Sequence, residues 1–570
     1  MAEHSGNGEF EMNELPTGHY HGIEVESETN ELPSGNAHAQ AHEDHRPRHP
    51  HGTGTYSFVM RVNRPAANFS ENVAHPPATI DPQQDRARPR VLYMGYDPAD
   101  NLDPLNWLRG RKYLFLATIC FMSFLTDFLS GYGVPMMLPQ SQEWGVSLID
   151  VTRSLTGNTF TQGLGSVLTI PFAQRYGVLP VMFWCTSMTL MFTILCAVSP
   201  NWIGSIAIRV LQGFFSSAPQ VLGLTIIQEM FIFEEHARMI GIWGWSVLIG
   251  PYFGPFMGSF ILKALTWRQA WWVAVGLVAF GLLLVILILE ETGYDRVNRF
   301  NNPLHPGGYF EDKVFTLSGM MGYEAGGRKK FFQAVHDIWL VFRQPQFVLL
   351  FIYHGTTYMW TVGLNGTLIS YLVPTVSKGG YGFDTVGLGL IYFAPIVAII
   401  LGELFGHFFN EALQNRSIRR NQGIFKPEDR LWGLYHASPL MTLGLILVGF
   451  SLERHWHWSV VAVTWGLFVF AAMTSTVVIS AYVLDCFPEQ SAITAALLNF
   501  SRVFFGFLAP IFQKTWSNKV GADWSFTTQG FICLLALLLV ITVQRFGKNW
   551  RTKGEMGPSM IMLQHGATAR

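Results

Sequence analysis

Four ionisable side chains lie inside long apolar stretches of this sequence: Asp127, Arg209, Glu403 and Arg502. A charged group in the hydrocarbon core of a bilayer costs about 3 kcal/mol or more, so such residues commonly pair with one another or line a path for protons or solutes. These residue types allow a carboxylate to bind and release a proton under the control of a nearby cation.

Asp127 and Arg209 are predicted to lie at the same depth. Asp127 is about 15 residues into the first apolar stretch, and Arg209 is about seven residues into the fourth, which runs in the opposite direction. These positions lie roughly 22 Å from one edge and roughly 10 Å from the other edge of a core about 30 Å thick. If both helices line one cavity, the two side chains can pair or share a proton. Their separation would then set the proton affinity of the carboxylate, whereas a permanent structural ion pair is the alternative.

The second half of the chain offers further candidates. Glu403 lies in the inner third of the eighth stretch, where it is either a second protonation site or a gate contact to a cytoplasmic arginine. Arg502 lies near the middle of the eleventh stretch and requires an acidic partner, a group of carbonyls or an anionic substrate. A membrane histidine such as His354 is either hydrogen-bonded structure or a proton carrier. The candidates for the substrate cavity are Gln212, His354, Tyr358 and Asn365.

Glycines recur every four residues within the apolar run 239–262. They share one helical face, and a face without side chains lets another helix approach closely. Prolines in the same run remove backbone donors and bend the helix. A static packing helix is the alternative to a functional one. The proposed packing motif consists of Gly241, Gly250, Gly254, Pro255 and Gly258.

The composition defines the class of protein that holds these residues. The chain has 570 residues, of which 49% are hydrophobic and 14% are charged, whereas a soluble chain carries about 25% charged residues. This indicates a polytopic membrane protein. A formal net charge of −1 argues against a nucleic-acid partner. The five cysteines lie in or at the ends of apolar runs, so we predict that they form neither a disulfide framework nor a metal site. We also expect no cofactor.

Twelve apolar stretches are long enough to cross a bilayer as helices, because about 20 residues span the hydrocarbon. We therefore predict an all-α membrane protein with two lobes of six transmembrane helices, separated by a polar stretch. The predicted spans are 113–138, 152–172, 178–198, 202–226, 237–262, 268–289, 346–373, 385–409, 432–452, 458–484, 492–514 and 526–546.

Charges between the spans indicate the orientation. Most loop arginines and lysines lie on the side of Lys112, and the positive-inside rule places that side, with both chain ends, in the cytoplasm. The predicted parts are a disordered tail (1–105), an N-terminal lobe (106–290), a central cytoplasmic loop (291–345), a C-terminal lobe (346–547) and a C-terminal tail (548–570).

These features resemble those of the major facilitator superfamily. The run 250–258 is similar to the antiporter signature on the fifth helix of such carriers, with Ser259 where a second glycine is usual. The resemblance implies a major facilitator fold in which this helix packs at the seam between the two halves. The run 209–213 and Asp127 resemble motifs of drug:proton antiporters. Other segments resemble a fungal branch with polyamine and histidinol-type transporters and secondary-metabolite exporters: 103–107, 290–296, 419–428 and 481–489.

We thus predict a proton-coupled secondary transporter of a small organic molecule, and not an enzyme. The sequence contains no phosphate-binding loop of the kind that ATP-driven pumps use. Export by proton antiport is expected, because the fifth-helix signature belongs to that branch. The alternatives are proton-coupled uptake of polyamine-like cations and a membrane sensor that binds solute without moving it. The expected partners are the substrate, protons and the lipid bilayer, for a monomer in the plasma membrane or in a vacuolar or other organelle membrane.

Overall fold

The computed structural model describes residues 59–60, 92–93, 97, 100–294, 309–320, 330–375, 377, 379–421, 426–487 and 490–553. The chain divides into two units, Met1–Gly52 and Thr53–Arg570, and every element named below belongs to the second unit. Most of the two tails and much of the central loop lie outside the described residues. The predicted boundaries of these parts therefore remain predictions.

The first half contains six membrane spans. The fourth span is broken at Ser217, just before Pro219, so that it consists of two helices. The spans are α1 (Arg109–Tyr132), α3 (Leu148–Tyr176), α4 (Val178–Val198), α5 (Trp202–Ser216) with α6 (Ala218–Met230), α7 (Phe233–Ala264) and α8 (Trp267–Leu287).

The second half contains six more spans, several of which are also broken into two helices. They are α12 (Pro345–Thr367) with α13 (Ile369–Leu372), α14 (Thr385–Ile391) with α15 (Phe393–Arg420), α16 (Leu434–Glu453), α17 (Trp458–Cys486), α18 (Ser491–Gly506) with α19 (Ala509–Val520), and α20 (Ala522–Lys553).

Short elements precede and connect the spans. The helices are η1 (Pro104–Asn106), α2 (Met137–Trp144), α9 (Tyr309–Ser318), α11 (Phe331–Phe342) and η4 (Pro427–Gly433). Two strands of two residues each, β1 (Val59–Met60) and β2 (Leu92–Tyr93), pair in antiparallel orientation ahead of the first span.

Eleven spans within the described residues are long and apolar enough to cross a membrane. The twelfth, α3, has 29 residues but carries buried polar side chains, among them Asn158, Gln162 and Ser166. Its low hydropathy has a physical reason, because α3 packs on both α5 of its own lobe and α18 of the second half, so its polar groups face protein. Asn158 Nδ2, for example, donates to the carbonyl oxygen of Arg209 on α5 over 2.8 Å. The prediction of an all-α protein with twelve spans is confirmed.

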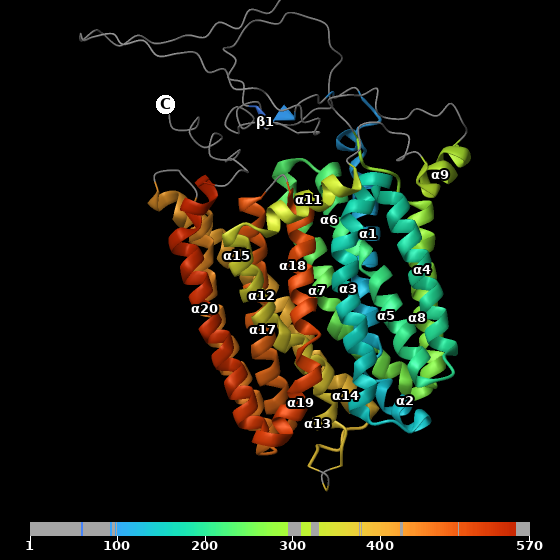
Figure 1. Cartoon of the computed structure of the whole chain (residues 1–570), viewed down its shortest axis with the longest axis vertical. Helices are drawn as coiled ribbons and strands as arrows, with labels where there is room; N and C mark the ends of the chain where they lie inside the picture. The colour runs from blue at the N-terminus through green and yellow to red at the C-terminus, as the bar shows by residue number, and fades with distance from the viewer. Residues whose placement is uncertain are drawn as a thin grey trace, which may run out of the picture. The chain divides into compact units, whose positions relative to one another are not determined.

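The two halves lie side by side (Figure 1), and they repeat one packing scheme. In the first half α1 packs on α7, α3 on α5 and α4 on α8. In the second half the equivalent spans pair in the same order, α12 on α18, α15 on α17 and α16 on α20. The halves meet where α3 and α6 contact α18, and where α7 contacts α14 and α15. Each half is therefore one six-helix lobe.

The glycine face of α7 packs against α1, backbone to backbone. A Cβ atom added at Gly250 would come within 2.8 Å of the Phe124 carbonyl oxygen, and one at Gly254 within 2.5 Å of the Phe128 oxygen. Gly258 approaches Tyr132 in the same way, at 3.1 Å. The expectation of close packing thus fits these three glycines.

Two details of the α7 motif differ from the expectation. The glycine face meets α1 of its own lobe, whereas the seam between the lobes is formed by another face, where Ser259 packs against Gly389 of α14. A Cβ atom added at Gly241 would have no atom within 4 Å, so no close helix contact requires a glycine at this position. The four-residue spacing of the glycines predicted a close helix contact, but it did not predict which helix makes that contact.

Candidate functional site

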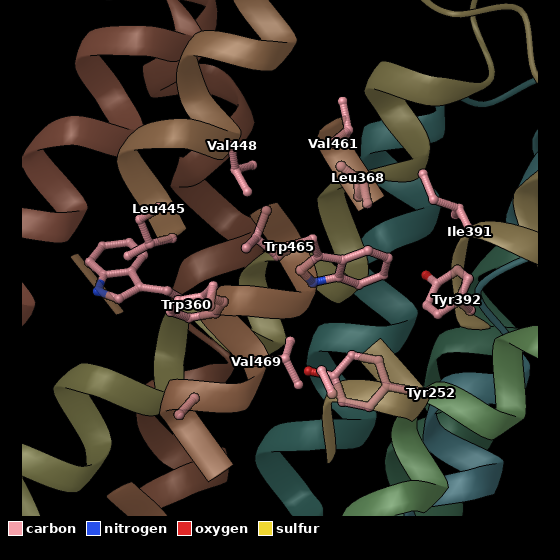
Figure 2. Packing of buried hydrophobic residues seen from close by; sticks show 14 of the residues in the cluster. Tyr252, Trp360, Leu368, Ile391, Tyr392, Leu445, Val448, Val461, Trp465 and Val469 are labelled. Atoms are coloured by element: carbon pink, nitrogen blue, oxygen red, sulfur yellow. The ribbon is translucent and has the colours of Figure 1, made fainter. Parts of the chain in front are cut away.

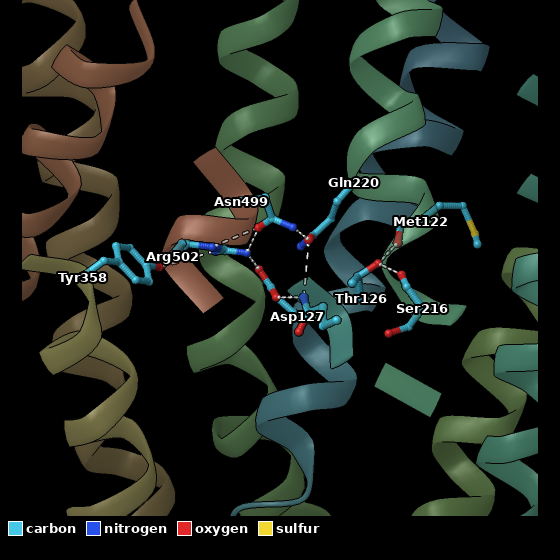
Figure 3. Close-up of polar contacts among 9 residues, drawn as sticks. Met122, Thr126, Asp127, Ser216, Gln220, Tyr358, Asn499 and Arg502 are labelled. Atoms are coloured by element: carbon cyan, nitrogen blue, oxygen red, sulfur yellow. Dashed lines mark hydrogen bonds and ion pairs between the residues drawn. The ribbon is translucent and has the colours of Figure 1, made fainter. Parts of the chain in front are cut away.

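A buried ion pair joins Asp127 of α1 to Arg502 of α18. Arg502 Nη2 donates to Asp127 Oδ2 over 2.8 Å, and the exposed fractions are 4% for Asp127 and 5% for Arg502. Because α1 belongs to the first lobe and α18 to the second, this pair links the two lobes (Figure 3).

Side-chain amides complete the site around the ion pair. Gln162 of α3 donates from Nε2 to Asp127 Oδ1 over 2.5 Å. Arg502 donates to Asn499 Oδ1 from Nη2 over 2.8 Å, and Asn499 Nδ2 donates in turn to Gln220 Oε1 of α6 over 3.2 Å. Both oxygens of the carboxylate therefore accept a hydrogen bond, one from each lobe (Figure 3).

The energetics of this arrangement depend on every bond being present. Removing two charges from water costs several kcal/mol per ion, and mutual attraction offsets this only when the remaining donors and acceptors are also paired. Asp127 and Arg502 meet that condition through Gln162 and Asn499. Loss of either charge would leave the other buried and uncompensated.

Tyr358 and His354 of α12 lie beside this network. The Tyr358 hydroxyl lies 3.5 Å from Arg502 Nη1, and the guanidinium lies 5.4 Å from the centre of the tyrosine ring. The rings of His354 and Tyr358 are 5.7 Å apart. Both ring nitrogens of His354 are buried without a hydrogen-bond partner among the described residues. Two of the predicted cavity residues thus lie next to the ion pair.

Arg209 does not pair with Asp127 in this structure, contrary to the expectation. Its Nη1 donates to the carbonyl oxygen of Leu129 over 3.0 Å and its Nη2 to that of Ser130 over 3.1 Å. These carbonyls belong to the last turn of α1 and lack helical donors, and a cation is favoured at that end of a helix. The equal depth of the two residues in the membrane correctly predicted that Arg209 lies close to α1. Its side chain, however, binds the end of that helix and does not reach Asp127.

The remaining predicted residues lie apart from the ion pair. Gln212 accepts from Arg209 Nη1 over 2.7 Å and donates to Thr193 Oγ1 over 2.8 Å, so it supports the guanidinium within the first lobe. Glu403 of α15 is half-buried and forms no hydrogen bond or ion pair with a described residue. Its proposed role as a second protonation site remains a prediction.

A second contact between the lobes is aromatic. Tyr252 of α7 packs on Trp465 of α17 with ring centres 6.0 Å apart, and Tyr392 meets the same indole at 5.1 Å (Figure 2). All three rings are almost fully buried, in the largest apolar cluster of the described residues, which draws on both lobes. The Tyr252 hydroxyl and the Trp465 indole nitrogen have no hydrogen-bond partner among the described residues.

Three residues of the site were not predicted from the sequence: Gln162, Gln220 and Asn499. A signal for them was present, because each is an amide side chain inside a predicted span, where polar groups are costly without partners. The low hydropathy of α3 was a second signal. Only their assembly around Asp127 required the structure.

Two equivalent six-helix lobes with an ionic network between them define a membrane transporter built from structural repeats. The chain belongs to the Major Facilitator Superfamily, whose family model matches residues 116–510. It is a multi-pass membrane protein that transports small organic molecules.

Similar proteins come from fungi. MFS transporter cpaT of Aspergillus oryzae is 25% identical over 82% of this chain and 94% of its own length. Efflux pump radE of Floropilus chiversii is 25% identical over 83% of this chain and 87% of its own length. Fluconazole resistance protein 1 of Saccharomyces cerevisiae is 23% identical over 80% and 83%, respectively.

The fold is also similar to that of a solved structure. The human organic anion transporter MFSD10 (TETRAN) matches with a TM-score of 0.52 and 17% sequence identity, covering 75% of this chain and 99% of that chain. At this identity the likeness concerns the fold alone.

Proposed function

We propose that this transporter exports its substrate in exchange for protons, with Asp127 as the proton-binding group and Arg502 as the group that controls it. The observation that carries this proposal is the buried ion pair between the lobes. Protonation of Asp127 removes its negative charge, and Arg502 then loses the partner that offsets its desolvation. The ionic link between the lobes is thereby broken, which permits the lobes to rock apart.

Exchange requires that proton and substrate compete. A substrate that enters between the lobes must displace Gln162 or Arg502 from the carboxylate of Asp127. A protonated carboxyl group presents no negative charge, so it binds a hydrogen-bond donor or a cation less well. Each passage of the carrier between its two states then carries either the proton or the substrate.

The buried groups without partners favour a flat, mainly apolar substrate that carries hydrogen-bonding atoms. An unpaired buried polar group costs about 1–3 kcal/mol. His354, Tyr252 and Trp465 each have at least one such group, and the two last lie on opposite lobes. A planar molecule that enters between Tyr252 and Trp465 when the lobes separate would stack on these rings and satisfy their free donors.

The names of two relatives, an efflux pump and a fluconazole resistance protein, support export as the direction. Export out of the cell would place the carrier in the plasma membrane. We propose that the carrier acts as a monomer, because each chain brings both lobes of the site.

The direction of proton movement tests the proposal. Purified protein is placed in liposomes that hold a pH-sensitive dye, and a panel of planar drugs and metabolites is added outside. Antiport predicts that the lumen becomes alkaline, because protons leave as the substrate enters. Acidification of the lumen would overturn antiport and support proton-coupled uptake of cations such as polyamines. Binding with no change in lumen pH or substrate content would support the sensor alternative.

A further inference from the structure

We propose that the C-terminal lobe binds one anionic phospholipid in a cavity between the end of α15, η4, the start of α16 and the end of α20. The cavity has a volume of about 620 Å³, which is far larger than a single phosphate and within the range of small-ligand sites. The positive-inside rule places this end of the helices in the cytoplasm, where the membrane leaflet carries anionic lipids.

The charge of the cavity is positive. Arg420, Lys426 and Arg545 line it with exposed side chains, and none of the three forms an ion pair with another described residue. The one carboxylate in the lining, Asp429, already accepts hydrogen bonds from Ser417 Oγ and from Asn421 Nδ2. Lys426 Nζ donates to Asn421 Oδ1 over 2.8 Å, which uses one of its three N–H groups. The other two, together with the exposed guanidinium groups of Arg420 and Arg545, can donate to the phosphate oxygens of a headgroup.

Two aromatic side chains place this cavity at the level of the membrane interface. The rings of Trp432 and Tyr435 are 4.9 Å apart, and 47% of the Trp432 surface is exposed. Tyr435 is held in position because its hydroxyl donates to Gln544 Oε1 of α20 over 2.7 Å. Tryptophan and tyrosine are enriched at the boundary between headgroups and acyl chains.

One face of α20 continues from the cavity into the membrane as an apolar stripe. Ile541 lines the cavity one turn before Arg545, and Leu538 and Leu535 follow at helical spacing with exposed fractions of 56% and 66%. Leu535 lies roughly 15 Å below Arg545, about half of a core about 30 Å thick. The cations alone would suit any anion, but a charged site above an exposed apolar stripe fits a phospholipid.

Native mass spectrometry of the full chain tests this proposal. The probes are phosphatidylinositol 4-phosphate, phosphatidylserine and phosphatidylcholine, together with soluble inositol 1,4-bisphosphate. The test variant is Arg420→Gln, Lys426→Gln, Arg545→Gln. The matched control replaces three exposed cations on the other side of the membrane from the cavity, at the C-terminal ends of α7, α16 and α19. These changes are Lys263→Gln, Arg454→Gln and Lys519→Gln.

We expect the wild type and the control variant to retain one anionic lipid in preference to phosphatidylcholine. The test variant should bind the anionic lipids on the order of 100-fold more weakly, since each cation near an anionic surface contributes about a fivefold effect. Equal retention by the test and control variants would overturn the proposal. Binding of the soluble bisphosphate as tight as that of the lipid would overturn the assignment to a lipid.

Discussion

The side-chain amide of Asn365 on α12 donates to the backbone carbonyl of Pro251 on α7 over 3.0 Å, from one lobe to the other. In a regular helix this carbonyl would accept from residue 255, but Pro255 has no N–H group. Asn365 therefore replaces a helical hydrogen bond that the proline removed. The hydroxyl of Tyr392 donates to the carbonyl of Asn365 over 3.1 Å and supports this position.

Replacing Asn365 with leucine should leave the Pro251 carbonyl unpaired and lower the stability of the protein by about 1–2 kcal/mol. Pro255→Ala restores a helical donor to that carbonyl, so the double variant should recover much of the loss. Thermal unfolding of the two single variants and the double variant measures this coupling. If the stability changes of the two single variants simply add up in the double variant, the Asn365 side chain does not replace the helical hydrogen bond that Pro255 removed.

Asp127→Asn should abolish proton-coupled transport, because the amide cannot release a proton. It also leaves Arg502 without a counter-charge, which should cost about 3–5 kcal/mol of stability. The companion variant Asp127→Asn, Arg502→Gln removes both charges and should recover stability but not proton coupling. Flux with normal pH dependence in a folded Asp127→Asn variant would refute the role given to this carboxylate.

Arg209→Gln separates the two membrane arginines. Because Arg209 binds carbonyls at the end of α1, its loss should lower stability by about 1–3 kcal/mol. It should not remove the response to a pH gradient, as loss of Asp127 does. Thermal unfolding and dye-based proton flux distinguish these outcomes, with Arg209→Lys as a control that keeps the charge. Complete loss of proton movement in a stable Arg209→Gln protein would return the coupling role to this residue.

Gly254→Ala should prevent the close approach of α7 to α1, because the added Cβ would lie 2.5 Å from the carbonyl oxygen of Phe128. Backbone atoms on both sides leave little room to adjust, so we expect poor folding and loss of transport. Gly241→Ala is the matched control on the same helix, where nothing lies within 4 Å of the added atom. Comparable expression and activity of the two variants would contradict this account.

The sequence alone determined the class of protein, its twelve spans and the buried charges. Hydropathy is a local property of composition, so α1 and α18 were predictable with Asp127 and Arg502 inside them. The glycine period likewise predicted a close helix contact on α7. These inferences required no knowledge of which helices are neighbours.

Only the tertiary structure decided that Asp127 pairs with Arg502 and not with Arg209. Position along a span gives depth in the membrane, and both arginines lie deep enough to reach α1. Which one meets the carboxylate depends on the rotation of each helix about its axis and on how the lobes face one another. Those quantities arise from packing between residues hundreds of positions apart, and no local pattern encodes them.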